Sequence, residues 1–245
     1  MNNIVDMHCH ILPELDDGAK NDGEAYQMLR MAYDEGIRVI VATPHHHERR
    51  GMCTPGQYRR ALAKVRKMAR EIDERFYIMP GMEIYFSQDV IKKLEHKKVQ
   101  TMGESNYVLV EFSPNDEFRY IQQALQQIQM KGFYPIIAHI ERYRCFHDHM
   151  DDVEYLIEMG AYVQVNAGSI TGDSGRSAKK FVKQLLGEHM VHCVGTDAHG
   201  VDHRQPKMKK AAEHVERKYG EEYMRRIFFS NAKELLKKRK ENESE

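Results

Sequence analysis

Two short segments near opposite ends of the chain share one pattern, an apolar run that leads directly into histidine and aspartate. The first is Asp6-Met7-His8-Cys9-His10, and the second is Gly195-Thr196-Asp197-Ala198-His199. Side chains two residues apart on a strand point to the same face, so each segment can present two ligands to one ion. The pattern therefore predicts a metal site within a single domain that spans residues 1–245.

The composition argues against a nucleic-acid-binding protein. The 245 residues are 41% hydrophobic and 30% charged, and the 37 basic residues balance the 37 acidic ones. Proteins that bind nucleic acids usually carry a basic excess, which this chain lacks. We therefore expect no nucleic-acid partner. An anionic substrate remains compatible with this composition, because bound cations would supply positive potential that the sequence does not display.

The cysteines and the hydropathy favour a cytoplasmic protein. The four cysteines are widely spaced and form no Cys-x-x-Cys motif, which fits neither a zinc finger nor a disulfide scaffold. No signal peptide and no apolar run of about 18 residues is recognisable. We expect a cytoplasmic location and no membrane span. The charged tail from about residue 237 is expected to fray.

One cysteine has the spacing of a known catalytic motif. Cys53 and Arg59 match the Cys-x5-Arg pattern of cysteine-dependent phosphatases. That chemistry needs a strand followed by a loop whose backbone N–H groups converge on phosphate. No strand is expected before Cys53, and Thr54-Pro55 is typical of a helix start, where proline also removes one N–H donor. We therefore expect no catalytic role for Cys53.

Apolar runs alternate with helical periodicities along the whole chain, which indicates an α/β fold. Polar side chains follow nearly every apolar run. The C-terminal ends of the strands form the catalytic rim of a β/α barrel, whereas an open doubly wound sheet gathers its site at one switch point. The distribution therefore predicts a distorted TIM-like (β/α) barrel, complete or incomplete, with about seven parallel strands. The expected strands begin with Ile4 and Val5 and continue at 38–42, 76–79, 106–110, 134–138, 162–165 and 191–194; the expected helices lie at about 25–35, 54–73, 121–128, 153–159, 178–186, 208–218 and 223–238.

Nine residues at the ends of these strands are candidate metal ligands. Their nitrogen and carboxylate donors suit manganese, iron or zinc rather than a soft thiolate site. Nine donors exceed what one tetrahedral zinc uses, so we expect two or three divalent ions. Clustered ions can lower the pKa of bound water to about 7. They can also stabilise both the attacking and the leaving oxygen when water displaces a group from phosphorus. The candidates are His8, His10, Asp17, His45, Glu83, Glu111, His139, Asp197 and His199.

Two of these assignments have close alternatives in the sequence. His46 or His47 could replace His45, and Asp16 could replace Asp17, although we prefer His45 and Asp17. Glu83 and Glu111 would each pass for ordinary charges if they stood alone. We retain both because each follows an apolar run at the same rim.

Further blocks of sequence carry a resemblance to a known family. The most specific are Asp16-Asp17-Gly18 and His139-Ile140-Glu141-Arg142-Tyr143, with support from Thr43-Pro44-His45 and Gly81-Met82-Glu83-Ile84-Tyr85. Together with the two opening motifs, they make the chain resemble the PHP (polymerase and histidinol phosphatase) superfamily over essentially its whole length. Within it, the chain is most similar to the CpsB/YwqE branch of bacterial metal-dependent protein-tyrosine phosphatases.

The resemblance implies a distorted barrel of the PHP type with a trinuclear metal centre, often assigned as manganese. It also implies a phosphotyrosine protein substrate, namely a bacterial tyrosine kinase that regulates capsular or exopolysaccharide synthesis. The nine candidate ligands fall on the family's ligand positions. Arg142 and Arg204 fall on its phosphate-contacting arginines, with Arg204 in the looser match. An arginine fork suits phosphate because it can donate two parallel hydrogen bonds.

These residues lead to a hypothesis of direct hydrolysis by a metal-activated hydroxide. Arg142 and Arg204 would hold phosphate oxygens. A strong general acid is dispensable for a phenolate leaving group, and Asp17 or His199 could serve as one through a metal-bound water. The alternative function is a small-molecule phosphatase of the histidinol-phosphate type. A metal-dependent nuclease and an inactive metal-binding regulatory module are weaker alternatives, because the chain has no basic excess and its donor set is intact.

Overall fold

The computed structural model describes residues 3–237, and this part of the chain contains nine parallel strands in two sheets. The order is β1-β2-β4 in one sheet and β3-β5-β6-β7-β8-β9 in the other. Residues 238–245, most of the tail that was expected to fray, lie outside the described residues. The strands are β1 (Ile4–Cys9), β2 (Ile37–Ala42), β3 (His45–His46), β4 (Tyr77–Pro80), β5 (Glu83–Tyr85), β6 (Tyr107–Glu111), β7 (Tyr134–Ile137), β8 (Tyr162–Asn166) and β9 (Cys193–Gly195).

The parallel α/β fold agrees with the sequence prediction, but the expected count of about seven strands in one barrel does not describe the two sheets. The difference arises because the expected strands at 38–42 and 76–79, observed as β2 and β4, are each followed by a short strand that was not predicted, β3 and β5. Thr43 and Pro44 separate β2 from β3, and proline has no N–H to donate to a sheet. Gly81 and Met82 separate β4 from β5, and a Cβ at Gly81 would lie only 2.6 Å from Val41 Cγ1. Each break stands directly before a candidate ligand.

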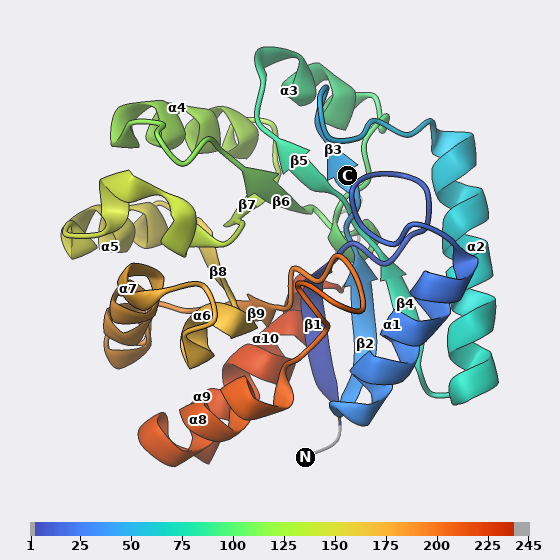
Figure 1. The fold of residues 1–245 in the computed structure, drawn as a ribbon. Helices are drawn as coiled ribbons and strands as arrows, with labels where there is room; N and C mark the ends of the chain where they lie inside the picture. Colours follow the sequence, from blue (N-terminus) through green and yellow to red (C-terminus); the bar gives the residue numbers. More distant parts are fainter. Residues whose placement is uncertain (1–2, 238–245) are drawn as a thin grey trace, which may run out of the picture.

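The first and last strands lie side by side, although they are far apart in sequence (Figure 1). The His10 N–H donates to the Ala198 carbonyl at 2.9 Å, and the Asp197 N–H donates to the His8 carbonyl at 2.7 Å. A side chain at Gly195 would collide with His8, since its Cβ would lie 2.4 Å from His8 Cβ. This close approach joins the two motifs that opened the sequence analysis.

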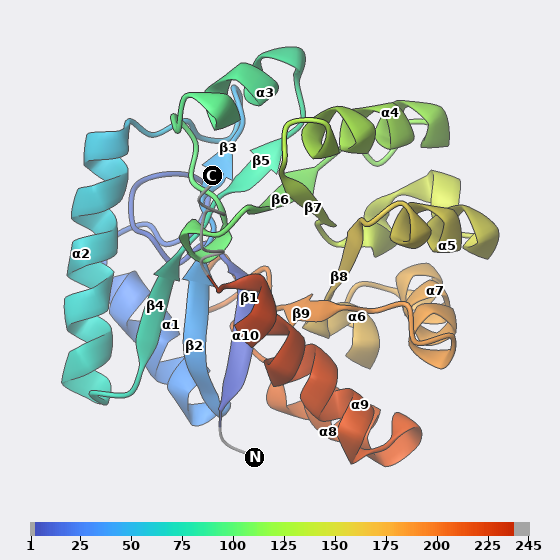
Figure 2. The same ribbon diagram turned by 180° about the vertical axis from the view of Figure 1, so that it is seen from behind.

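Helices surround the strands on the outside, as Figures 1 and 2 show from opposite sides. The expected start of α2 is correct, because Thr54 and Gln57 form a reciprocal capping box and Pro55 occupies the first turn. The expected helix at 223–238 is interrupted by a π-helical turn, Arg226–Ser230. Short helices α3 and α6 were not predicted. No helix among residues 3–237 is long and apolar enough to cross a membrane. The helices are α1 (Asp22–Asp34), α2 (Pro55–Ile72), α3 (Gln88–Glu95), α4 (Phe118–Gln129), α5 (Met150–Glu158), α6 (Ala167–Thr171), α7 (Arg176–Gly187), α8 (Lys209–Tyr219), α9 (Glu221–Arg225) and α10 (Asn231–Leu235).

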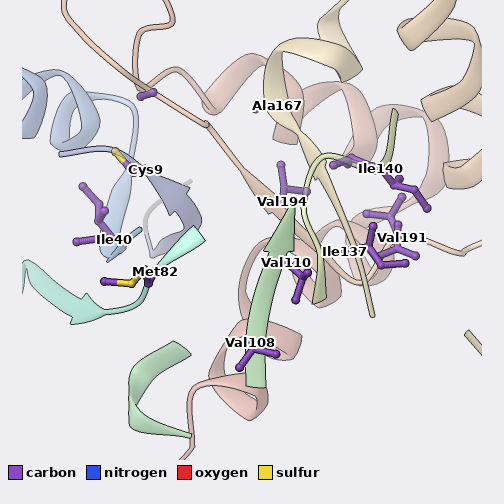
Figure 3. Close-up of a cluster of buried hydrophobic side chains, with 14 of the residues drawn as sticks. Cys9, Ile40, Met82, Val108, Val110, Ile137, Ile140, Ala167, Val191 and Val194 are labelled. Carbon is purple, nitrogen blue, oxygen red and sulfur yellow. The ribbon is translucent and has the colours of Figure 1, made fainter. Parts of the chain in front are cut away.

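Two clusters of buried apolar side chains form the core. The larger one, partly drawn in Figure 3, includes Cys9 of β1 and Ile40 of β2, whereas Val5 and Met7 of β1 belong to the smaller one. Strict alternation would place Met7 and Cys9 together, but the β1–β2 register shifts between Asp6 and Cys9. Cys9 is a fully buried free thiol that packs in the larger cluster.

Candidate metal centre

Glu83 lies at the middle of the candidate ligands, at the start of β5. Its Oε2 is 3.3 Å from His8 Nε2, 3.2 Å from His10 Nε2 and 2.8 Å from His45 Nδ1. Its Oε1 is 2.7 Å from His139 Nε2. One fully buried carboxylate therefore contacts four imidazoles that come from β1, β3 and the end of β7.

The other candidates extend this centre in two directions. Asp197 Oδ1 lies 3.5 Å from the Nε2 atoms of both His8 and His10. Asp17 Oδ1 lies 3.4 Å from His45 Nε2 and 3.4 Å from His199 Nε2. Potential ligand atoms within 4.8 Å of one another form three overlapping groups; these are His10, Asp17, His45 and His199; His8, His10, Glu83 and Asp197; and His45, Glu83 and Glu111.

His139 belongs to none of these three groups but lies against two of them. Its Nε2 is 3.7 Å from Glu111 Oε1 as well as 2.7 Å from Glu83 Oε1. All nine predicted ligands therefore come together, despite spanning residues 8–199.

The buried atoms of this cluster lack the partners that buried polar groups normally have. Within the described residues, the atoms without a hydrogen-bond partner include Glu83 Oε2 and Glu111 Oε2. His45 Nδ1 and His199 Nε2 are also unpartnered, again counting residues 3–237 only. Unpaired lone pairs that converge on one place would be costly unless cations occupied it. Nitrogen and oxygen donors in overlapping groups fit two or three divalent ions that share ligands.

The backbone of two of these residues is strained. His139 has φ 31° and Asp197 has φ 54°, both in the left-handed region that residues other than glycine rarely adopt. Such strain persists where surrounding contacts fix the geometry, and it is common at functional sites.

The alternatives to His45 and Asp17 have other contacts. Asp16 Oδ2 accepts hydrogen bonds from His10 Nδ1 at 2.7 Å and from the His45 N–H at 2.8 Å. These bonds leave His10 Nε2 directed to the cluster. His46 Nε2 lies 3.3 Å from Lys93 Nζ, and His47 Nδ1 accepts from the backbone of the following turn. Asp16, His46 and His47 are absent from the three ligand groups found among residues 3–237.

Two buried amides that the sequence analysis missed connect three of the candidate ligands. Gln164 Oε1 accepts the His139 N–H at 2.8 Å and lies 3.2 Å from His8 Nδ1. Gln164 Nε2 donates to Asn166 Oδ1 at 2.9 Å, and Asn166 Nδ2 donates to Asp197 Oδ2 at 2.9 Å. These hydrogen-bonded amides, which we call the amide chain, direct His8 Nε2 toward the cluster and hold Asp197 in place. The sequence did contain a signal for these two amides, because Gln164 and Asn166 alternate with valine at the end of an expected strand.

Asp6, to which the sequence analysis assigned no role, is hydrogen-bonded to Thr196 of the second motif. It accepts a 2.6 Å hydrogen bond from the Thr196 hydroxyl and a 2.8 Å bond from the Thr196 N–H. Burial raises the pKa of Asp6 to about 6, although these bonds oppose the shift. Asp6 therefore fixes the loop that carries Asp197 without reaching the cluster.

The pKa values of three residues of the cluster, Glu83, His139 and His199, suit metal ligands. Burial alone would raise the pKa of Glu83, but His8 and the hydrogen-bonded histidines hold it well below its usual value. Burial, with the neighbouring Arg142 cation, lowers the pKa of His139 to about 4. Burial and His10 likewise lower the pKa of His199 to about 4. Metal ligands must be ionised carboxylates or neutral imidazoles, which these pKa values provide at neutral pH.

Two predicted phosphate-binding arginines lie at the mouth of the cluster. Arg142 Nη2 and Arg204 Nη2 both pair with Asp197, through its Oδ2 and Oδ1 respectively. The side chains of Arg142 and Arg204 are 36% and 41% exposed, whereas that of Asp197 is 2% exposed; we call this solvent-exposed side of the cluster the opening. A third arginine, Arg50, was missed by the sequence analysis; its Nη1 donates to Glu111 Oε1 at 2.8 Å.

The comparison with protein families agrees with this geometry. The family model for capsular polysaccharide synthesis, CpsB/CapC, matches residues 4–237. The chain belongs to the CpsB/CapC family.

Relatives within the CpsB/CapC family match along nearly their whole length. The tyrosine-protein phosphatase CpsB of Streptococcus pneumoniae is 35% identical over 240 residues, which covers 95% of this chain and 98% of that protein. The tyrosine-protein phosphatase YwqE of Bacillus subtilis is 33% identical over 241 residues, covering 96% and 92%. The fold and the family therefore extend over the same residues.

Solved structures give the same result. A structure from a crystallographic study of YwqE and CpsB, described there as metal-dependent tyrosine phosphatases, superposes with a TM-score of 0.87 at 33% identity, covering 95% of this chain and 94% of that chain. Dihydropyrimidinase from Brevibacillus agri superposes with a TM-score of 0.63 at 11% identity, covering 96% and 71%, a likeness that shows the fold alone.

In this member of the CpsB/CapC family, Cys53 lies outside the ligand cluster on the approach to α2. Burial raises the pKa of the Cys53 thiol, which makes the nucleophilic thiolate scarce at neutral pH. The geometry therefore offers no support for a cysteine-dependent mechanism.

Proposed function

We propose that this chain is a metal-dependent protein-tyrosine phosphatase that hydrolyses phosphotyrosine on a protein substrate. The observation that carries the proposal is the joint presence of three overlapping ligand groups, with unpaired buried lone pairs, beside exposed arginine forks. The relatives CpsB and YwqE carry the name tyrosine-protein phosphatase, which supports the choice of substrate.

The proposed cofactor is a set of two or three divalent ions, manganese first, with iron or zinc also compatible with the donors. The ligands would be the nine predicted residues, with Glu83, His10 and His45 each belonging to two of the groups. Bound ions of this kind supply positive charge for the phosphoryl oxygens and make water nucleophilic near neutral pH.

The side chains of the chain itself would bind and orient the phosphoryl group. Arg142 and Arg204 can each present a planar fork to non-bridging oxygens, a geometry that lysine lacks. Negative charge on these oxygens changes as water attacks phosphorus, so donors fixed in place contribute most at the transition state. The paired contacts of both arginines with Asp197 hold them at the opening before substrate arrives.

The leaving group lowers the demand for a general acid. A tyrosine phenol has a pKa of about 10, so phenolate departs more readily than an alkoxide. The neighbouring His199 imidazole holds the pKa of Asp17 well below its usual value, and the pKa of His199 itself is lowered to about 4. Neither group carries a readily donated proton at neutral pH. We therefore propose ligand roles for both and assign no general acid.

The wider setting is also part of the proposal. The two sheets would together form one distorted TIM-like barrel of the PHP type, in a single domain spanning residues 1–245 of a cytoplasmic protein. The substrate would be a bacterial tyrosine kinase that regulates capsular or exopolysaccharide synthesis, in keeping with the family description.

The test compares two substrates on manganese-loaded protein. We expect turnover of a phosphotyrosine peptide with a much higher kcat/KM than for histidinol phosphate. The reverse preference would replace the proposal with the small-molecule alternative. Absence of turnover on both, in protein with a full ion complement, would contradict phosphatase activity altogether.

A further inference from the structure

The turn at residues 47–51 lies beside the cluster and is held by several hydrogen bonds. The His47 N–H donates to the Gly51 carbonyl at 2.8 Å, and the Gly51 N–H donates back at 3.0 Å. His47 Nδ1 accepts the N–H groups of Arg49 at 2.9 Å and Arg50 at 3.2 Å. The His47 ring packs edge-on against Tyr85 of β5, with ring centroids 4.4 Å apart. His47 thus closes the turn and fixes the backbone from which Arg50 extends.

The turn rests against the loop that carries two aspartates of the site. A Cβ at Gly51, whose φ is 156°, would lie 2.7 Å from the Leu15 carbonyl oxygen and 2.8 Å from Asp16 Cβ. Asp16 in turn bonds to His10 and to the backbone of His45. The position of Arg50 is therefore coupled to that of the ligand cluster through backbone contacts.

Arg50 reaches from this turn to the cluster and retains free donors. Its Nη1 donates to Glu111 Oε1 at 2.8 Å, where the Glu111 side chain is 4% exposed. The Arg50 side chain is 42% exposed. A guanidinium has five N–H donors, and one nitrogen makes the only side-chain hydrogen bond that Arg50 has among residues 3–237. The remaining donors are available to an anion that enters the opening.

Arg50 pairs with a different carboxylate of the cluster from the two arginines already assigned. Arg142 and Arg204 pair with Asp197, which adjoins His8 and His10. Arg50 pairs with Glu111, which adjoins His45. All three arginines are exposed to a similar degree, and each pairs with a carboxylate of the cluster through one side of its fork.

We propose that Arg50 is a third arginine that contacts the phosphoryl group of the substrate, from the Glu111 side of the opening. The inference rests on the proposed phosphatase function and adds a catalytic residue to it. A phosphoryl group in transfer spreads its charge over three oxygens, so donors on two sides stabilise it better than donors on one. The competing interpretation is that Arg50 only neutralises Glu111.

The experiment compares Arg50→Gln with Arg49→Gln. Arg49 is the matched control, because it is the exposed neighbour in the same turn and its side chain has no hydrogen bond or ion pair within residues 3–237. Both variants and the unaltered chain are loaded with manganese, and their ion content is measured. Binding of inorganic phosphate is then measured by calorimetry, and kcat/KM on a phosphotyrosine peptide.

We expect Arg50→Gln to weaken phosphate binding about tenfold or more and to lower kcat/KM about a hundredfold, the effect of removing one fixed donor. Arg50→Lys should recover part of the loss, since it keeps the charge without the fork. Arg49→Gln should match the unaltered chain in both measurements.

Normal phosphate affinity in fully loaded Arg50→Gln would overturn the inference. So would a loss of ions with unchanged phosphate affinity per loaded site, since that result would give Arg50 a role toward Glu111 alone. Failure of the proposed function is distinguishable. It would appear as absent phosphotyrosine turnover by the unaltered chain, whereas phosphate binding can be compared without turnover.

Discussion

The Asp197 end and the Glu111 end of the cluster provide the same kind of ligand in different ways. Asp197 follows a short strand, has a left-handed φ of 54°, and accepts hydrogen bonds from Asn166 and Arg142 besides its ion pair with Arg204. Glu111 is the last residue of a regular strand and accepts a side-chain hydrogen bond from Arg50. One carboxylate is held by several fixed donors, and the other by a single donor on a surface turn.

The ionisation of the two carboxylates follows this difference. Burial alone would raise the pKa of Asp197, but His8 and Arg142 hold it well below its usual value. Burial and the neighbouring Glu83 charge raise the pKa of Glu111, and His45 and Arg50 only partly offset them. The Asp197 end is therefore prepared as an anion before any ion binds, whereas the Glu111 end depends more on the arriving cation.

Glu83 is common to both ends, so its loss should have the largest effect. Glu83→Gln keeps the shape but removes the charge shared by four imidazoles. We expect the bound ions to be lost, and with them the several kcal/mol of transition-state stabilisation that such ions provide. Metal analysis and turnover of a phosphotyrosine peptide measure this, with Glu95→Gln as a surface control. A Glu83→Gln variant that keeps all its ions would remove Glu83 from the centre of the account.

Arg142 should have the next largest effect, because we propose that it contacts the substrate from the Asp197 end of the cluster. Arg142→Ala should cost about 2–4 kcal/mol in transition-state stabilisation, and Arg142→Lys should recover only part of that. Metal content should remain normal in both variants. Near-normal kcat/KM in Arg142→Ala would make Arg142 a structural arginine that serves Asp197 only.

The amide chain should matter through metal affinity rather than through direct chemistry. Asn166→Ala removes the bond to Asp197 Oδ2 and should weaken manganese binding about 10- to 100-fold, as for other residues that orient ligands. Titration with manganese measures this, with the exposed Asn115→Ala as control. Equal affinities in the two variants would show that Asp197 needs no such support.

The smallest expected effect is a pH dependence of metal binding at the Asp197 end of the cluster. Burial opposes protonation of both His8 and His10. The negative charges of Glu83 and Asp197 outweigh burial at His8, and Asp16 outweighs it at His10, so both pKa values are raised above 6.5. A proton must leave each ring before an ion binds, so manganese affinity should fall as the pH falls toward and below these pKa values. Calorimetry in buffers of different ionisation enthalpy should detect proton release at pH 7. Binding without proton release would contradict these protonation states.

The sequence was sufficient to select candidate ligands that the fold brings together, because all of them except Asp17 follow an apolar run and parallel strands end at the same rim. It did not reveal the short strands β3 and β5, because their pairing depends on close packing at Gly81 and on contacts between distant segments. Gln164, Asn166 and Arg50 were missed for a related reason. Their roles lie in hydrogen bonds to residues that the fold brings near, and no local pattern records which partner an amide or a surface arginine will meet.

The central claim is that turnover depends on bound metal and on no thiol. The most direct test is to remove metal from the purified chain with a chelator, assay a phosphotyrosine peptide, and then add manganese back, with Cys53→Ser carried through the same steps. The account predicts that activity disappears with the metal, returns with manganese, and is the same in Cys53→Ser. Turnover that survives verified removal of all metal, or that disappears in Cys53→Ser, would contradict it.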